Sequence, residues 1–312
     1  MGTLIAQIPR RAPTKGIMTD TKQKVREFYD EIGWQQEADG NYQNARYEDL
    51  RPVSAEYIHK TRLRVNDGLI PNGKFLLDAG SGPVQYDDYL TYSKGYQKRV
   101  CLDISIQALT EARTRLGTHG LFVVGDLANL PFKADAFDGE VSMHAIHHLA
   151  LEEHPKAYAE LHRVLAPGRT GVIVNGWHEP LLIRAAEPLI GLMRRLSGKG
   201  AKKKKDWLNE ADPEGTFIAK LTPEWLKREI GSKIPLEIRP WRSLSTRILR
   251  WFVQPKFGGQ IFLRFVFWLE GVFPRFFAEN GQYPMIVIRK EKLSKSSNSS
   301  HLSGIELSRD KK

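Results

Sequence analysis

Residues 75–82 read Phe-Leu-Leu-Asp-Ala-Gly-Ser-Gly, an apolar run that ends in an acidic residue and a glycine-rich turn. The run has the length of a buried strand, and the pattern after it indicates a helix. Gly80 and Gly82 lack a Cβ, so they permit a tight turn and let backbone amides approach a ligand closely. A parallel sheet presents a ligand crevice at this position, at the carboxyl end of a strand. The stretch alone is typical of many nucleotide-binding folds.

Short apolar runs alternate with helical stretches around this turn, which is typical of repeated βαβ units. The pattern predicts strands at residues 75–78, 99–103, 121–125, 138–143 and 170–175, in doubly wound order. Helices are predicted between them at 86–94, 106–116 and 155–165, and before them at 20–32 and 48–69. Helices at 180–196 and 222–230 and strands at 236–241 and 283–290 follow.

The composition sets the size and setting of the fold. A chain of 312 residues can form one large core with additions, because single cores stop growing near about 250–300 residues. With one cysteine, Cys101, no intramolecular disulfide can form, which favours a cytoplasmic setting. Residues 1–19 lack the sustained apolar core of a signal peptide, and we expect a flexible leader. Residues 291–312 are rich in Ser, Lys and Asn, and we expect a disordered tail.

An acidic residue at the end of the second predicted strand extends the glycine turn into a ligand site. Asp103 follows the turn by about 20 residues, where a carboxylate accepts hydrogen bonds from ribose hydroxyls. Both nicotinamide dinucleotides and S-adenosylmethionine carry such a ribose. A dinucleotide fingerprint Gly-x-Gly-x-x-Gly requires a third glycine at position 85, where this chain has Gln85. This departure disfavours a nicotinamide-dependent oxidoreductase.

Six short motifs in a fixed order distinguish S-adenosylmethionine from a nicotinamide dinucleotide as the ligand. They are Leu-Asp-Ala-Gly-Ser-Gly from Leu77, Asp-Ile-Ser from Asp103, Gly-Asp-Leu-x-x-Leu-Pro-Phe from Gly125, Phe-Asp-Gly from Phe137, His-His-Leu from His147 and Arg-Val-Leu-Ala-Pro-Gly from Arg163. As a set they resemble the type 11 methyltransferase domain of class I S-adenosylmethionine-dependent methyltransferases, which includes quinone and sterol methylating enzymes. The resemblance covers about residues 74–175. The chain departs from the family at Val84 and Arg169, where glycine is common.

The resemblance implies a Rossmann-like α/β fold with a doubly wound, mostly parallel seven-stranded sheet whose last strand is antiparallel. It also implies S-adenosyl-L-methionine as the cofactor. The spacing of His144, His147 and His148 could suit a metal, but no nearby carboxylate or cysteine completes a site, and we expect none. The residues that the resemblance assigns to the cofactor are Asp78, Gly80, Ser81 and Gly82 for the methionine part, Asp103 for the ribose, and Asp126 with Leu127 for the adenine. Ile104, next to Asp103, is also predicted to contact the cofactor. Tyr29, in Phe28-Tyr29-Asp30, resembles a tyrosine that closes over the cofactor in some relatives.

Histidines at the end of the fourth predicted strand are the candidates for catalysis. Methyl transfer from a sulfonium is an in-line displacement, so positioning supplies much of the acceleration, and a general base is needed only when the acceptor must lose a proton. His144 lies at the strand end and titrates near neutral pH, so we predict that it contacts the acceptor or acts as the base, beside the cofactor. His148 belongs to the His-His-Leu motif and is the second candidate.

The acceptor class is narrowed by what the sequence lacks. The formal net charge of +11 would suit nucleic acid or an acidic membrane. Amino-methylating enzymes of nucleic acids and of protein glutamine usually carry Asn/Asp-Pro-Pro-aromatic after the fourth strand, where this chain has Met143-His144-Ala145-Ile146. A cytosine-C5 enzyme needs a nucleophilic cysteine, whereas Cys101 lies within a predicted strand. We therefore expect O- or C-methylation of a small-molecule or lipid-like acceptor, with an RNA or protein methyltransferase as an alternative.

Residues 247–277 form an insertion between the last two predicted strands that is much longer than a hairpin. They mix large aromatic and aliphatic side chains with Arg247, Arg250, Lys256 and Arg264. The mixture suits a helix at a membrane surface or a lid over an apolar substrate, and the same residues could complete the core. We expect a cytoplasmic protein with membrane contact through this insertion.

The predicted organisation is therefore a leader at 1–19, helices at 20–73 that cap the cofactor site, an S-adenosylmethionine-binding core at 74–177, substrate-side helices, insertion and final strands at 178–290, and the tail. A catalytically inactive protein that binds S-adenosylmethionine and serves as an interaction module is the alternative from another functional class. The sequence does not fix the oligomeric state.

Overall fold

A computed structural model of the chain describes residues 20–35, 42–196 and 216–292. The predicted leader at 1–19 lies outside these residues, as does the predicted tail from residue 293 onward. Within the described ranges, no helix is both long enough and apolar enough to cross a membrane.

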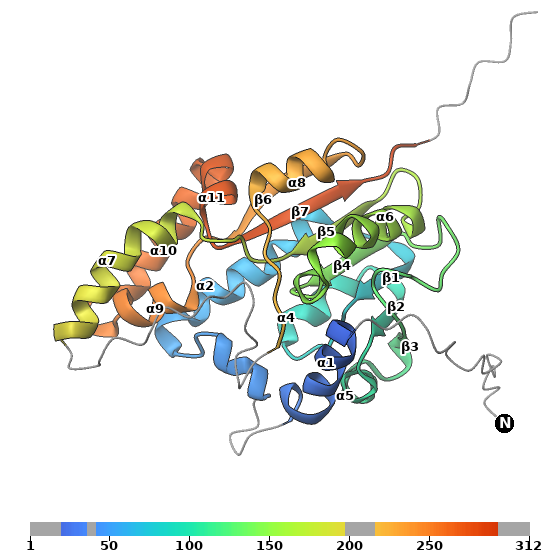
Figure 1. Ribbon diagram of the computed structural model, residues 1–312, viewed down its shortest axis with the longest axis horizontal. Coiled ribbons are helices and arrows are strands. Elements are labelled where there is room, and N and C mark those ends of the chain that lie inside the picture. Colours follow the sequence, from blue (N-terminus) through green and yellow to red (C-terminus); the bar gives the residue numbers. More distant parts are fainter. Residues whose placement is uncertain (1–19, 36–41, 197–215, 293–312) are drawn as a thin grey trace, which may run out of the picture.

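A seven-stranded sheet forms the centre of the molecule (Figure 1). Its strands are β1 (Gly73–Ala79), β2 (Tyr96–Asp103), β3 (Gly120–Val124), β4 (Gly139–Met143), β5 (Thr170–Val174), β6 (Leu236–Arg242) and β7 (Tyr283–Arg289), in the order β3-β2-β1-β4-β5-β7-β6. Strands β1 to β5 pair in parallel, and β7 pairs antiparallel with both β5 and β6. The prediction of a doubly wound, mostly parallel sheet with an antiparallel last strand is confirmed.

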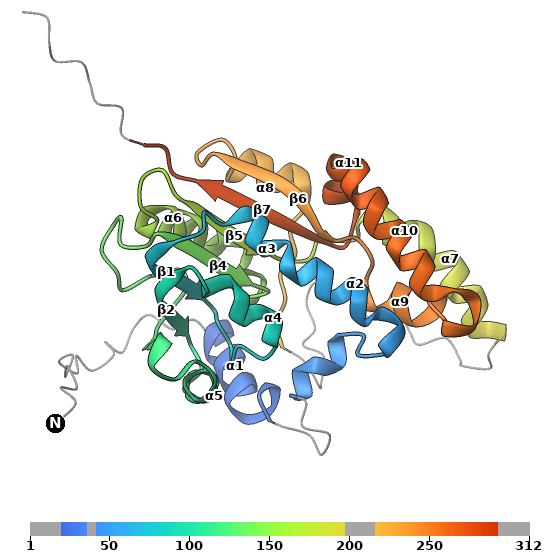
Figure 2. The same ribbon diagram turned by 180° about the vertical axis from the view of Figure 1, so that it is seen from behind.

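Helices cover both faces of the sheet (Figures 1 and 2). They are α1 (Asp20–Phe28), α2 (Pro52–Leu63), α3 (Val65–Gly68), α4 (Asp87–Leu90), α5 (Ile106–Leu116), α6 (His154–Val164), α7 (Leu181–Leu196), α8 (Pro223–Glu229), α9 (Thr246–Phe252), α10 (Gly259–Val272) and α11 (Pro274–Asn280). The core cluster on one face contains side chains of α6 and α8. The cluster on the other face contains side chains of α3, α4 and α5.

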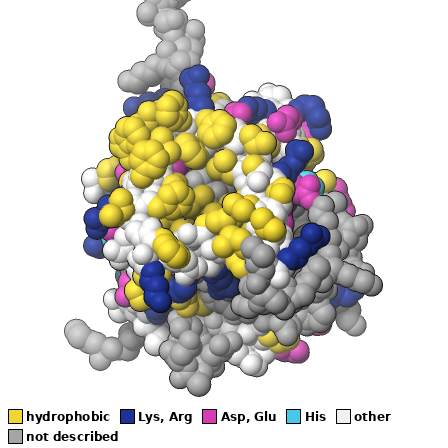
Figure 3. Space-filling model, turned by 90° about the vertical axis from the view of Figure 1, so that its left-hand side faces the viewer, with side chains coloured by type: hydrophobic (Ala, Val, Ile, Leu, Met, Phe, Trp, Pro, Cys, Tyr) yellow, Lys and Arg dark blue, Asp and Glu magenta, His cyan; other side chains and the backbone are white. Residues whose placement is uncertain are grey.

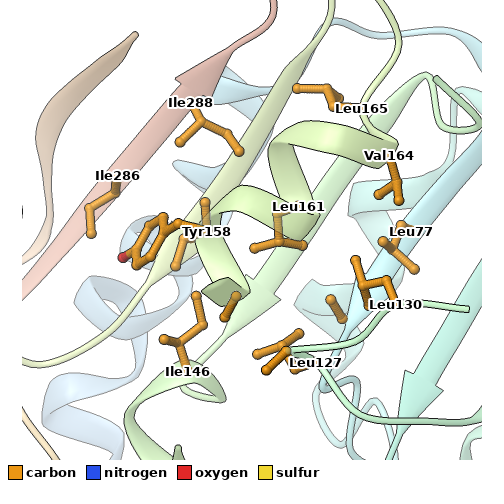
Figure 4. Close-up of a cluster of buried hydrophobic side chains, with 14 of the residues drawn as sticks. Leu77, Leu127, Leu130, Ile146, Tyr158, Leu161, Val164, Leu165, Ile286 and Ile288 are labelled. Carbon is orange, nitrogen blue, oxygen red and sulfur yellow. The ribbon is translucent and has the colours of Figure 1, made fainter. Parts of the chain in front are cut away.

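Alternation along β1 shows why the sequence builds two buried layers. Leu76 and Leu77 are adjacent and both fully buried, yet Leu77 belongs to the cluster under α6 and Leu76 to the opposite cluster. Successive side chains of a strand point to opposite faces, so a strand covered on both sides reads as a continuous apolar run. Figure 4 shows Leu77 packed with Leu161 of α6 and with Leu127 from the loop after β3.

The predicted helices differ from the structure mainly at their ends. The helix predicted at 48–69 begins at Pro52 and is divided at Arg64 into α2 and α3. The stretch predicted at 86–94 forms only the short α4 and a 3-10 turn at Thr91–Ser93. After α1 the helix widens into a π-helical turn, Tyr29–Gly33, a rare form that is frequent at functional sites.

The insertion before β7 forms α9, α10 and α11 and packs with α2 and α7 around a third cluster of buried side chains. A fully buried carboxylate joins this unit to the core. Glu270 of α10 accepts hydrogen bonds from the Tyr57 hydroxyl (2.6 Å) and the Ser243 amide (2.9 Å), and its other oxygen is paired with Arg64 (2.7 Å). A buried carboxylate is tolerated because its lone pairs are used in this way.

Glu140 in β4 is a buried carboxyl group of the opposite kind. Its side chain is 1% exposed, and neither carboxyl oxygen has a hydrogen-bond partner among the described residues. Burial raises its pKa well above the usual value, because desolvation disfavours the charged form. The folded protein must therefore keep a proton on this carboxyl group that the unfolded chain releases near pH 4.5.

We predict that Glu140→Leu gains stability relative to the original chain as the pH rises from 5 to 8, because the unfavourable proton uptake is removed. The stabilising effect of the raised pKa is complete below the unfolded pKa and is lost as pH increases, by at most about 1.4 kcal/mol per pH unit. Urea unfolding at several pH values measures the difference. Glu224→Leu on the exposed side of α8 is the matched control. A difference in unfolding free energy that is constant over this pH range contradicts the prediction.

Candidate active site

The turn after β1 has a backbone that requires glycine at two positions. Gly80 has φ +74°, and a Cβ there would lie 2.3 Å from the Cβ of Ala145. Gly82 has φ +53°, and a Cβ there would lie 3.0 Å from the ring of Trp34. The amides of Gly80 and Ser81 donate to the Leu102 carbonyl oxygen (2.7 and 3.2 Å), which folds the turn over the end of β2. The glycines are therefore needed both for conformation and for space.

Val84, the departure from the family's glycine, adopts the conformation of a glycine. Its φ is +53°, which is a strained value for a β-branched residue. The side chain is fully buried in the cluster that contains α5. Burial of the valine offsets the backbone strain, so the family's turn persists without the third glycine.

Asp103 closes the turn from the end of β2. One carboxylate oxygen accepts from the Gly82 amide (2.8 Å) and the other from the Ser105 amide (2.9 Å). Burial raises the pKa of Asp103 to about 6, while the backbone amides of Ser105 and Gly82 act against this rise. Each oxygen has a second lone pair, so the ionised carboxylate can still accept hydrogen bonds from a ligand.

A cavity lies above this turn, at the carboxyl ends of β1 to β4. Its walls come from the turn, from the ends of β2 and β4, from the loop after β3, and from α1 with its π-helical turn. The lining residues are Lys22, Val25, Tyr29, Trp34, Gly80, Ser81, Gly82, Pro83, Gln85, Tyr89, Leu102, Asp103, Ile104, Gly125, Asp126, Leu127, Met143, His144, Ala145, His148 and Leu149. The structure thus brings together every residue predicted for the site except Asp78.

Asp78 differs from the expectation. It is 2% exposed, it does not line the cavity, and one of its carboxylate oxygens accepts from Nε (3.0 Å) and Nη2 (2.5 Å) of Arg99. Arg99 is itself buried and donates its remaining terminal nitrogen to the Tyr89 carbonyl oxygen (2.5 Å). Asp78 therefore lies beneath the turn with its carboxylate paired to Arg99, and its predicted contact with the cofactor stays a prediction.

One face of α1 closes the cavity. Lys22, Val25 and Tyr29 lie on it at helical spacing, and the Tyr29 ring stacks on Trp34 with centroids 5.0 Å apart. At one end, the Lys22 ammonium group bridges Asp126 (2.8 Å) and Glu153. The pKa of Asp126 is lowered although burial opposes this, because Lys22 and neighbouring donors stabilise the carboxylate. Asp126 is therefore an ionised hydrogen-bond acceptor in the wall.

His148 connects the cap to the end of β4, and its partners fix its tautomer. Its Nδ1 lies 2.8 Å from the Phe217 carbonyl oxygen, which can only accept, so Nδ1 carries the proton. Nε2 then accepts from the Tyr29 hydroxyl (2.7 Å), and Nε2 of His147 lies 3.1 Å from the same nitrogen. Burial lowers the pKa of His148 to about 4. Both ring nitrogens are used within the protein, so the structure favours a positioning role over the predicted catalytic one.

His144 lies at the opposite end of the cavity wall from Asp126. Its φ is +56°, and its amide donates to the Val174 carbonyl oxygen (2.7 Å), which holds this strained residue at the strand end. The ring contacts those of Trp241 (5.2 Å) and Tyr283 (5.3 Å) edge-on. Burial and then Arg242 lower its pKa to about 3, so the imidazole is neutral at physiological pH.

Sequence reasoning missed several wall residues, above all Lys22, Trp34, Gln85 and Tyr89. The spacing of Lys22 and Val25 relative to Tyr29 was a usable signal, because residues four and seven positions before the tyrosine share its helix face. Gln85 and Tyr89 follow the glycine turn but carry no distinguishing pattern. Among the described residues, no cluster of three or more His, Cys, Asp and Glu side chains could hold a metal ion.

The donor and acceptor set of the cavity fits S-adenosylmethionine. Ionised Asp126 can accept from the adenine amino group, and Asp103 can accept from the ribose hydroxyls. The buried Trp34 indole nitrogen has no partner within the described residues, so a donor remains in the wall. The space at Gly80 and Gly82, which a Cβ would fill, lets the backbone lie close to a bound molecule.

Comparison with known proteins agrees with this fit. A family sequence model described as a methyltransferase domain, of type 11, matches residues 77–173. No match was found among curated proteins. The fold is similar to that of geranyl diphosphate C-methyltransferase from Streptomyces coelicolor A3(2) in complex with Mg²⁺, geranyl diphosphate and S-adenosyl-L-homocysteine. The two chains share 13% identity over 89% of this chain and 99% of that one, with a TM-score of 0.51.

A second solved structure is phosphoethanolamine N-methyltransferase 2 from Haemonchus contortus in complex with S-adenosyl-L-methionine. It is 14% identical over 89% of this chain and 61% of that chain, with a TM-score of 0.49. A possible histamine N-methyltransferase from Thermotoga maritima is 15% identical over 76% of this chain and 90% of that chain, with a TM-score of 0.46. Residues 77–173 therefore form a methyltransferase domain of type 11, and the strand order is that of the Rossmann-like methyltransferase fold.

Proposed function

We propose that this methyltransferase methylates an oxygen or carbon atom of a small-molecule or lipid-like acceptor. The observation that carries the proposal is the character of the cavity around His144. Met143 and Ala145 flank His144 in the lining, and the rings of Trp241 and Tyr283 contact it. The charged Arg242 and Glu48 near it are paired with each other, and His144 itself is neutral. An apolar wall with a few placed polar groups is typical of sites for small organic molecules.

The cofactor supplies a methyl group on a sulfonium centre, and the protein's task is to position the acceptor in line with it. With a pKa of about 3, His144 is a weak base, whereas its neutral ring can donate or accept a hydrogen bond. We therefore propose that His144 orients the acceptor. His148 and Tyr29 hold the cap against the end of β4, which keeps water from the reacting atoms.

A lipid-like acceptor is supported by the insertion as well as by the cavity. Several large apolar side chains between residues 247 and 277 are exposed, among them Phe257, Ile261 and Trp268. Others in the same stretch, including Ile248, Leu249 and Leu263, are buried and complete the third core cluster. The insertion thus combines a core-forming side with an exposed apolar side, and we propose that the exposed side contacts a membrane surface.

We predict that Asp103→Ala weakens the binding of S-adenosylhomocysteine by about 100-fold, because two hydrogen bonds to a charged acceptor are lost. Isothermal titration calorimetry measures this affinity. Asp103→Asn keeps one acceptor oxygen for the turn and should give an intermediate loss in a folded protein. Asp87→Ala, on exposed α4, is the matched control and should leave the affinity unchanged. Equal affinity for all four proteins would place the cofactor elsewhere.

The affinity for S-adenosylhomocysteine should also fall with acidity in a defined range. With a pKa of about 6, the Asp103 carboxylate is ionised above this pH and protonated below it. Only the ionised form accepts from both ribose hydroxyls, so binding should be constant between pH 7 and 8 and weaken as the pH decreases below about 6. In Asp103→Asn this decrease should disappear. A decrease of the same size in the variant would exclude Asp103 as its source.

The acceptor class is tested by following the methyl group from cofactor labelled with tritium on the methyl carbon into a cell extract. We predict label in metabolites that partition into organic solvent, with none transferred by Asp103→Ala. Label confined to RNA or protein would support the alternative methyltransferase classes. Cofactor binding without transfer of label to any fraction would support a catalytically inactive interaction protein.

A further inference from the structure

Three helices at one end of the molecule present a broad apolar surface. We define the platform as the exposed apolar side chains of α7, α10 and α11 together with Phe257, which precedes α10. From the contacts and charges described below, we infer that the platform docks on the surface of a bilayer that contains anionic phospholipids. The inference deepens the proposed function, because it specifies the surface from which a lipid-like acceptor would come.

Helix α10 has apolar side chains on both of its sides. Leu263 and Val266 are buried in the third core cluster, at the spacing of one helix face. On the outer side, Ile261 is 72% exposed and Trp268 is 57% exposed, and the Trp268 ring stacks on Phe265 with centroids 5.7 Å apart. A helix of a water-soluble surface carries polar residues on its outer face, so this outer face indicates a partner.

Helix α7 widens the platform beyond the insertion recognised in the sequence. Figures 1 and 2 show α7 beside α10, and Ile190 of α7 is buried in the same cluster as Leu263. Leu189 and Leu192 on its other side are 50% and 52% exposed. Figure 3 shows hydrophobic side chains gathered over this end of the molecule. Because α7 and α10 share their buried side, their exposed sides form one surface.

The charges around the platform favour an anionic bilayer. Residues 181–196 and 246–280 together hold eight basic residues, Arg184, Arg194, Arg195, Arg247, Arg250, Lys256, Arg264 and Arg275, and three acidic ones, Glu187, Glu270 and Glu279. Glu270 is fully buried, Arg247 is paired with Glu187, and Arg264 is paired with Glu56 of α2, so the net charge of the platform helices is positive. Figure 3 shows basic side chains at the border of the hydrophobic area. Apolar side chains with basic neighbours are typical of surfaces that enter the lipid headgroup region. A second copy of the chain would bring the same positive charge to the contact, which disfavours dimerisation through this surface.

The platform is joined to the acceptor end of the cavity. Its helices α10 and α11 lie in the insertion between β6, which ends at Arg242, and β7, which begins at Tyr283. The rings of Trp241 and Tyr283, at these two strand ends, both contact His144. The Glu270 contacts with Tyr57, Arg64 and Ser243 then fix α10 relative to the core. The strand ends that carry α10 and α11 therefore also carry the rings that contact His144, which links a bilayer on the platform to the acceptor end of the cavity.

Vesicle co-sedimentation of the full chain tests the inference without any methyl transfer. We expect binding to vesicles of phosphatidylcholine mixed with phosphatidylglycerol, weaker binding to phosphatidylcholine alone, and a decrease with added salt. The double variant Ile261→Ser with Trp268→Ser should bind the anionic vesicles about tenfold more weakly, because two large apolar side chains no longer enter the lipid. The matched control Leu121→Ser with Leu151→Ser removes two exposed leucines outside the platform and should bind as the original chain does.

Absence of binding to anionic vesicles, or equal binding by both double variants, would overturn the inference. A concentration-dependent dimer in analytical ultracentrifugation that the platform variant alone abolishes would overturn it in favour of a second copy of the chain. The platform variant should still bind S-adenosylhomocysteine as tightly as the original chain. If the original chain fails to bind anionic vesicles while it still binds S-adenosylhomocysteine and transfers the methyl group, the docking surface is rejected and the proposed methyl transfer stands.

Discussion

The left-handed turn at Gly80 and Gly82 is the constraint on which the rest of the site depends. Its amides bond to the end of β2, and Asp103 at that same end accepts from the Gly82 amide. The turn can adopt this shape only because Gly80 has no Cβ, since a Cβ there would lie 2.3 Å from the Cβ of Ala145, which follows β4. Three strand ends are thereby held together around one space. The cap, the adenine end and the acceptor end are built outward from this fixed point.

A second constraint places the substrate-side helices. Glu270 is fully buried and has four contacts, with the Tyr57 hydroxyl, the amide and hydroxyl of Ser243, and Arg64. These contacts must form together, and they determine where α10 lies on α2 and on the end of β6. Leaving any partner out would strand a charge inside the protein, which is strongly unfavourable. One carboxylate thus fixes a unit whose outer surface is apolar and whose inner edge reaches His144. This arrangement links the proposed membrane contact to the proposed chemistry.

Local sequence pattern was sufficient for the positions of the strands, whereas the antiparallel last strand and most of the cavity residues followed from the resemblance to the type 11 methyltransferase domain. Buried strands such as β1 appear as apolar runs. The motif residues Gly80, Asp103 and Leu127 follow or end strands, and the carboxyl ends of parallel strands lie at one edge of the sheet. Long-range partners could not be read in this way. Arg99 is paired with Asp78, and Lys22 is paired with both Asp126 and Glu153. His148 is hydrogen-bonded to the Tyr29 hydroxyl and to the Phe217 carbonyl oxygen. The partners lie far apart in the sequence, and no regular spacing predicts that they meet. The sequence also could not predict which side chains of α10 are exposed, because a continuous apolar run does not show which side of the helix is buried.

The crystal structure of the full chain with S-adenosylhomocysteine tests the central claim most directly. The account predicts density in the cavity between the glycine turn and α1, with the ribose hydroxyls on Asp103, the adenine between Ile104 and Leu127 beside Asp126, and the sulfur toward His144. Density outside this cavity, or a bound molecule whose ribose does not reach Asp103, would contradict it.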